Sequence, residues 1–224
     1  MSAGSNFEEQ VAGIAPEVAA GYAQVRAGID SDGALPASFK ALVSAVCSSV
    51  LGQLEPARRE LERGRALGLS EREIAIAGVA LLLGRGEVQT QRFIDLAGGL
   101  EPAATPRPPS EIDAEAYFLQ YLGVDALPAR MAIMRRYVPD VFAGYQRMHH
   151  GVLAADPTAT RSSEMVLVGV NAAQLQTRFI SIHAATARKA GATDEQLVEC
   201  VVCAIPSAGI AAWAAGAEGL FPDA

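Results

Sequence analysis

Apolar residues recur along most of the chain at spacings of three and four, which place them on one side of a helix. The period-two alternation and Asn-Gly turns that would predict β-strands are absent. Two stretches, Ala37–Val50 and Arg161–Val170, are apolar for most of their length. The pattern therefore predicts an all-α protein.

Proline and polar breaks divide this pattern into separate helices. Pro16 and Pro139 suit the first turn of a helix, where a missing backbone N–H costs nothing. We expect the helix that begins at Pro139 to end at Gly151. Gly52 and Asn171 are the breaks expected after the two apolar stretches.

Further boundaries come from capping signals. Two segments have the pattern of a capping box, in which a Ser or Thr side chain and a Glu or Gln side chain satisfy the first backbone N–H groups. They are Ser70–Glu73 and Thr193–Gln196. Glycines are expected just after the helices that precede these boxes, at Gly68 and Gly191, and after the helices that follow them, at Gly86 and Gly209.

The chain also resembles itself. The segment around Pro16 matches the segment around Pro139, which lies 123 residues further on, and the same offset pairs Gln53 with Gln176 and Arg65 with Arg188. We predict two tandem helical copies, at about residues 11–98 and 134–220, packed as a pseudo-twofold pair.

The predicted organisation follows from these copies. Residues 1–100 form an N-terminal repeat, and residues 101–110 form a linker with four prolines that cannot be helical. Residues 111–224 form the C-terminal repeat, preceded by two added helices at about 111–121 and 128–137.

Charge and composition exclude several classes of function. A net charge of −7 with dispersed arginines argues against binding to nucleic acid. No apolar run is long enough for a membrane span, and the first ten residues do not have the pattern of a signal peptide. The odd number of cysteines, three, argues against a disulfide framework, so we expect a cytoplasmic protein.

The second copy carries a recognisable order of residues. Glu164 is followed by Gln176, Phe179 and His183, and then by the turn Gly191-Ala192-Thr193-Asp194-Glu195. This order resembles the alkylhydroperoxidase D / carboxymuconolactone decarboxylase family, whose redox branch has cysteines where Gln176 and Phe179 stand. The resemblance implies an all-α alkylhydroperoxidase D-like fold and a homo-oligomer.

The departures from the family pattern limit the chemistry. Without the two cysteines, the family's dithiol peroxidase reaction has no thiolate nucleophile at this site. The decarboxylase branch has a His-Glu pair where this chain has Arg178 and Phe179. In the first copy, the four equivalent positions hold Ala41, Gln53, Pro56 and Glu60, so we interpret that copy as structural.

Two residues are the candidate catalytic groups. Histidine is the side chain best suited to acid–base work near neutral pH, and we assign that role to His183, with Glu164 orienting it. The alternative is a structural His–Glu hydrogen bond in the core. Candidate substrate-binding residues share helix faces with these groups or carry suitable chemistry: Gln176, Phe179, Tyr145, Arg178, His149 and Trp213. The histidine spacing fits no metal motif, so we predict neither a metal nor a cofactor.

The leading hypothesis is a cofactor-free enzyme of the carboxymuconolactone decarboxylase type. It would act by acid–base chemistry on a small cyclic or enolisable acid, through decarboxylation, isomerisation or cyclisation. A non-catalytic binding protein of the same fold is the alternative. A peroxidase using Cys200 and Cys203 is less favoured, because these residues fall inside a predicted helix.

Overall fold

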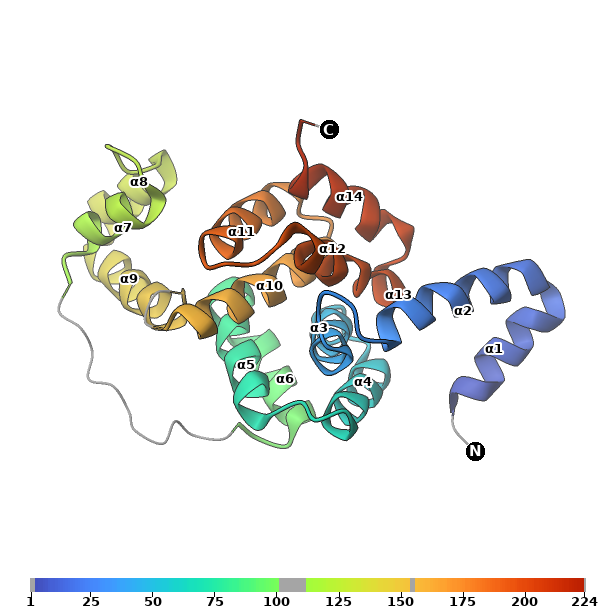
Figure 1. Cartoon of the computed structure of the whole chain (residues 1–224). Helices are drawn as coiled ribbons and strands as arrows, with labels where there is room; N and C mark the ends of the chain where they lie inside the picture. The colour runs from blue at the N-terminus through green and yellow to red at the C-terminus, as the bar shows by residue number, and fades with distance from the viewer. Residues whose placement is uncertain (1–2, 101–111, 154–155, 224) are drawn as a thin grey trace.

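The computed structural model describes residues 3–100, 112–153 and 156–223, and within these ranges it is helical, with no strand. The helices of the first half are α1 (Ala3–Ile14), α2 (Pro16–Asp30), α3 (Ala37–Val50), α4 (Leu54–Ala66), α5 (Glu71–Arg85) and α6 (Glu87–Ala97). Those of the second half are α7 (Ala114–Leu122), α8 (Ala129–Tyr137), α9 (Pro139–Leu153), α10 (Pro157–Ala173), α11 (Thr177–Lys189), α12 (Asp194–Val202), α13 (Ile205–Ala208) and α14 (Ile210–Leu220) (Figure 1). The all-α prediction is confirmed, and the predicted linker at 101–110 lies outside the described residues.

Several predicted boundaries are confirmed. Helices α2 and α9 begin at Pro16 and Pro139, and α3 spans Ala37–Val50. Both capping boxes are closed by reciprocal hydrogen bonds at the starts of α5 and α12. Gly68 and Gly191 follow α4 and α11 with φ of 91° and 89°, a backbone conformation that favours glycine.

Three boundaries differ from prediction. Gly151 does not end α9, which continues to Leu153. Asn171 does not break α10, because its side-chain amide donates to the Leu167 carbonyl at 2.7 Å and the residue stays within the helix. The helix before Gly209 ends at Val202, and the short α13 follows, because Pro206 cannot donate to a continuing helix.

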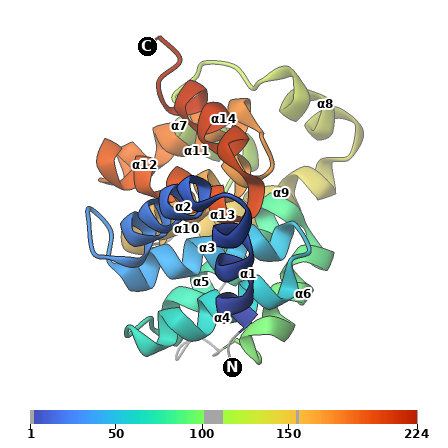
Figure 2. The same cartoon turned by 90° about the vertical axis from the view of Figure 1, so that its right-hand side faces the viewer.

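The core is built around α3 and α10, which pack against each other near the centre of the molecule (Figure 2). Helix α10 also packs against α5, α11 and α12, so one apolar cluster draws on both halves of the chain. Gly169 allows the close approach, since a Cβ there would lie 2.5 Å from Val43 Cγ1 and 3.1 Å from the Cys200 carbonyl oxygen. The two halves therefore share one core.

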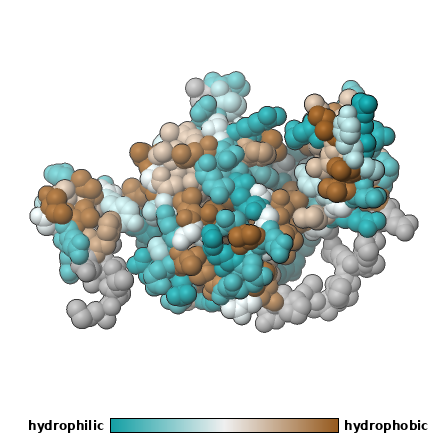
Figure 3. Space-filling model, turned by 180° about the vertical axis from the view of Figure 1, so that it is seen from behind, coloured by the Kyte–Doolittle hydropathy of each residue, from teal (hydrophilic) through white to brown (hydrophobic). Residues whose placement is uncertain are grey.

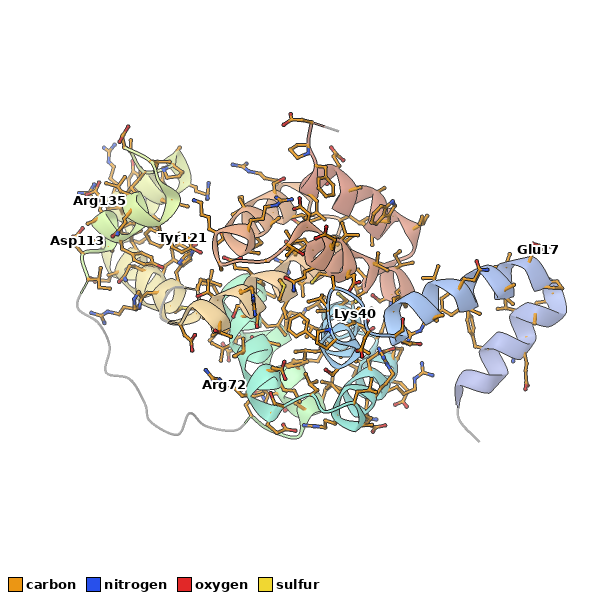
Figure 4. All side chains as sticks on the ribbon, in the orientation of Figure 1. Glu17, Lys40, Arg72, Asp113, Tyr121 and Arg135 are labelled. Atoms are coloured by element: carbon orange, nitrogen blue, oxygen red, sulfur yellow. The ribbon has the colours of Figure 1, made fainter. Side chains whose placement is uncertain are left out.

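Some local contacts recur at the offset of 123 residues. The Arg65 guanidinium donates to Glu71 at 2.8 Å, and the Arg188 guanidinium donates to Asp194 at 2.7 Å. These equivalent contacts agree with two related copies, while the pseudo-twofold packing remains a prediction. An ion pair also joins the two halves: Nζ of buried Lys40 on α3 lies 3.6 Å from Glu199 Oε2 on α12. Figure 4 labels Lys40.

Two helical units extend from this core. Helices α1 and α2 form an arm that extends from the core (Figure 1), and apolar side chains lie on its surface (Figure 3). Ile14 and Val18 are among its exposed apolar residues. Helices α7, α8 and α9 form the second unit, with a small cluster of their own that includes Phe118 and Phe142. Helix α9 packs on α5 and α10, which places this unit beside the candidate site. Among the described residues, none of the helices is long and apolar enough to cross a membrane.

Candidate functional site

The predicted acid–base pair is formed across two packed helices. Helix α10 carries Glu164 and helix α11 carries His183, and the two helices pack along their length. His183 Nδ1 lies 2.6 Å from Glu164 Oε2. The Glu164 side chain is 1 % exposed and that of His183 is 16 % exposed, so the contact is largely shielded from solvent. A hydrogen bond to a charged group in such a place is stronger than one in water.

The second oxygen of Glu164 is also occupied. The Tyr121 hydroxyl of α7 donates to Glu164 Oε1 at 3.1 Å, and Figure 4 shows Tyr121 between the α7–α9 unit and the main body. Burial, followed by the negative charge of Glu164, raises the pKa of Tyr121, so the phenol remains a donor near neutral pH. Tyr121, Glu164 and His183 thus form a continuous chain of hydrogen bonds.

His149 of α9 lies beside this chain. Its Nδ1 is 2.8 Å from the Tyr117 hydroxyl, and its ring packs edge-on against Tyr121 with 4.5 Å between centroids. Burial lowers the pKa of His149 to about 4, and the neighbouring His183 and His150 lower it further. His149 is therefore neutral near pH 7 and acts as a polar but uncharged part of the site.

A cavity of about 190 Å³ opens beside the Glu164–His183 pair. Both halves of the chain line it, because α5 contributes a wall opposite the second-half helices. Its lining consists of Leu83, Gly84, Arg85, Phe118, Tyr121, Leu122, Arg130, Met131, Tyr145, His149, Leu153, Glu164, Phe179, Ile182, His183 and Thr186. The cavity is smaller than the 300–1,000 Å³ usual for drug-sized ligands, so it suits a small molecule.

The structure brings together five of the candidate residues in this lining: Tyr145, His149, Glu164, Phe179 and His183. The other three lie elsewhere. Gln176 and Arg178, at the start of α11, are exposed to solvent, and Trp213 packs against the main core. None of these three is part of the cavity lining.

Sequence reasoning missed four polar residues of the cavity lining: Arg85, Tyr121, Arg130 and Thr186. Tyr121 lies in α7, outside the repeated segments, so the comparison of the copies gave no signal for it. Arg85 ends α5 in the copy that was interpreted as structural. The four-residue spacing of Tyr117 and Tyr121, which places both phenols on one face, was the available signal.

The corresponding place in the first half holds ion pairs instead. Glu60, which corresponds to His183, accepts from Arg26 at 2.8 Å and from Arg63 at 2.7 Å. Ala41, which corresponds to Glu164, has no polar side chain. With no imidazole there, this half lacks the acid–base pair of the second half.

The three cysteines lie in the core. Cys47 and Cys200 are fully buried and Cys203 is 1 % exposed. Burial raises the pKa of the Cys203 thiol to about 12 and also raises the pKa of the Cys200 thiol. A thiolate nucleophile is therefore disfavoured at Cys200-Val201-Val202-Cys203.

Two other kinds of site fit the structure less well. Within the described ranges, no group of three or more His, Cys, Asp or Glu side chains is arranged to hold a metal ion. A wider surface groove of about 580 Å³ lies between α4 and α6, but its charged side chains, such as Arg58 and Glu87, belong to no acid–base pair with histidine. The cavity beside His183 is therefore the better candidate.

Comparison with known proteins agrees with the fold. A sequence model described as the carboxymuconolactone decarboxylase family matches residues 139–219, which include α9 to α12 and both Glu164 and His183. No curated protein matches the chain. The resemblance to the carboxymuconolactone decarboxylase family that the sequence predicted is therefore confirmed over residues 139–219.

Proposed function

We propose that this protein is an enzyme that performs acid–base chemistry on a small cyclic or enolisable carboxylic acid, without a cofactor. The observation that carries the proposal is the buried contact between His183 Nδ1 and Glu164 Oε2 at the edge of a cavity. The family match over residues 139–219 supports a reaction of the decarboxylase type, and the buried cysteines argue against a thiol peroxidase.

We assign a role to each group of the hydrogen-bond chain. With Glu164 ionised, Nδ1–H of His183 donates to the carboxylate, and Nε2 is left with a lone pair that can accept a proton. The carboxylate then stabilises the imidazolium that forms, in a setting with little water to screen the charge. Tyr121 holds the other carboxylate oxygen and so fixes the direction of Glu164.

In each of the three reactions, His183 is the group that moves the proton. In an isomerisation, Nε2 of His183 takes a proton from carbon, the C–H electron pair forms an enolate, and the imidazolium returns the proton at another carbon. In a decarboxylation, Nε2 of His183 first takes the proton of the substrate's carboxylic acid group. The C–C bond then breaks, CO₂ leaves, and the electron pair remains as an enolate that the imidazolium protonates. In a cyclisation, the same group moves a proton to or from the carbon or oxygen that closes the ring.

Solvent exchange tests this proposal without a known substrate. Small cyclic and open-chain oxo acids are incubated with the protein in D₂O, and loss of the exchangeable C–H signal is followed by NMR. We expect exchange with the native protein and a rate lower by about 10²–10⁴-fold in His183→Ala. Arg178→Gln, on the same helix but exposed, is the matched control and should exchange at the native rate. Near-native exchange by a folded His183→Ala protein would remove His183 from the mechanism.

A non-catalytic binding protein is the second candidate. Two observations favour it: Arg178 and Phe179 stand where the decarboxylase branch has a His-Glu pair, and the cavity is small. Under this alternative, acids would bind in the cavity but neither exchange nor turn over. Binding with no exchange across the panel would therefore favour this alternative over the enzyme.

A further inference from the structure

Arg85 is a cation of the cavity that the acid–base mechanism does not use. It is the last residue of α5 and lines the cavity from the first half of the chain. No described carboxylate lies within ion-pair distance of its guanidinium. Burial alone lowers its pKa, with no acidic neighbour opposing the effect. A half-buried charge of this kind normally has an acidic partner.

The guanidinium is held in place by a neutral side chain. Arg85 donates to Asn171 Oδ1 at 2.5 Å and to the Gly84 carbonyl at 2.7 Å. Asn171 is fully buried, and its amide nitrogen donates to the Leu167 carbonyl at 2.7 Å, which directs Oδ1 towards Arg85. Asn171 therefore orients the guanidinium without neutralising it.

Two hydrogen bonds do not satisfy a guanidinium, which has five N–H donors. Its Nε is buried and has no acceptor within the described structure. Helix capping is an alternative role for Arg85, and it would account for the hydrogen bond to the Gly84 carbonyl. Capping explains neither the hydrogen bond to Asn171 nor the position of Arg85 in the cavity wall. The side chain is short of acceptors at a place that a ligand can reach.

The charge balance of the cavity points the same way. Glu164 is the carboxylate of the lining, and both of its oxygens are engaged by His183 and Tyr121. Arg85 and the more exposed Arg130 contribute two positive charges. A ligand that enters therefore meets an excess of positive charge, which favours an anion.

We propose that Arg85, oriented by Asn171, selects an anionic ligand by binding its carboxylate group. The ligand would then lie across the two halves of the chain, with its carboxylate at Arg85 and its reacting carbon at His183. A guanidinium suits this task because its planar donors match the two oxygens of a carboxylate. The inference rests on the proposed function only for the position of the reacting carbon.

Binding of a matched pair of probes tests the role of Arg85. Benzoate and benzamide have nearly the same shape and differ in charge, and their affinities for the full-length protein can be compared by NMR titration. We expect the native protein to prefer benzoate and Arg85→Gln to lose about 10-fold or more of that preference, as for other hydrogen bonds to charged groups. Arg178→Gln, which removes an arginine outside the cavity, should keep the native preference.

Two further variants keep the test decisive if Arg85→Gln does not fold. Arg85→Lys retains the charge without the planar donors and should bind benzoate more weakly than the native protein. Asn171→Asp supplies an internal carboxylate beside Arg85 and should also weaken benzoate binding. A native protein that does not prefer benzoate, or folded Arg85 variants that keep the full preference, would overturn the inference.

The result is independent of the exchange experiment. Selective binding of benzoate by a native protein that catalyses no exchange would leave the role of Arg85 intact and reject the enzymatic proposal. Exchange catalysed by a native protein that shows no preference for anions would support the enzymatic proposal and reject the role of Arg85.

Discussion

Acidification should destabilise this protein through His149. The side chain is 8 % exposed and lies beside Tyr117, His183 and His150. Its pKa falls from an ordinary 6.5 to about 4 in the folded state. Between these values the unfolded chain binds a proton that the folded protein does not, so stability falls as the pH drops.

The size of the effect follows from the two pKa values. Each pH unit between them corresponds to about 1.4 kcal/mol, so the full contribution is about 3 kcal/mol. The contribution is complete above a pH of about 6.5 and is lost progressively towards a pH of about 4. Most of the loss is therefore reached at about pH 4.5, where many domains are still folded.

Urea unfolding measures this loss directly. Free energies of unfolding at about pH 7 and about pH 4.5 are compared for the native protein and for His149→Gln, which keeps a polar group beside Tyr117. The variant should lose about 2–3 kcal/mol less on acidification than the native protein. Val168→Ala, a core variant without a titratable group, should shift both values equally. Equal pH dependence in the native and His149→Gln proteins would refute the assignment of a buried, neutral His149.

Two other predictions concern the shared core. Gly169→Ala should lower the free energy of unfolding by about 1–3 kcal/mol, because its Cβ would meet Val43 and the Cys200 carbonyl. Gly144→Ala on α9, with open space around it, should be neutral or stabilising. Equal urea midpoints for the two variants would contradict this account. The three buried thiols should resist a thiol-labelling reagent in the native protein and react in denaturant; rapid labelling of native Cys200 or Cys203 would restore the thiol peroxidase hypothesis.

Local sequence signals located most of the fold. Proline at Pro16 and Pro139 and the two capping boxes each specify a helix start through backbone hydrogen bonds a few residues away. Asn171 and Gly151 misled because tertiary packing decides whether a weak helix breaker ends a helix. The Asn171 side chain donates to the Leu167 carbonyl and accepts a hydrogen bond from Arg85 of α5, and both bonds fit a continuous helix.

The part of the candidate site that comes from one continuous segment of the chain could be predicted from the sequence. Glu164 and His183 lie on adjacent helices joined by a short turn, so their proximity could be expected from the chain order. Tyr121 and Arg85 reach the same cavity from α7 and α5, and such long-range placement has no local signal. Gln176 was expected beside His183 because seven residues make about two helical turns, but it precedes α11 and is exposed.

The position of the proton on His183 tests the central claim most directly. Long-range ¹H–¹⁵N NMR, with the His183 signals identified by their absence in His183→Gln, distinguishes the two neutral forms of the ring. The hydrogen bond to Glu164 predicts a proton on Nδ1 and a bare Nε2, with the Nδ1–H signal weakened or lost in Glu164→Gln. A proton on Nε2 with a bare Nδ1 would contradict the account, because the nitrogen assigned to accept a proton from the ligand would already carry one.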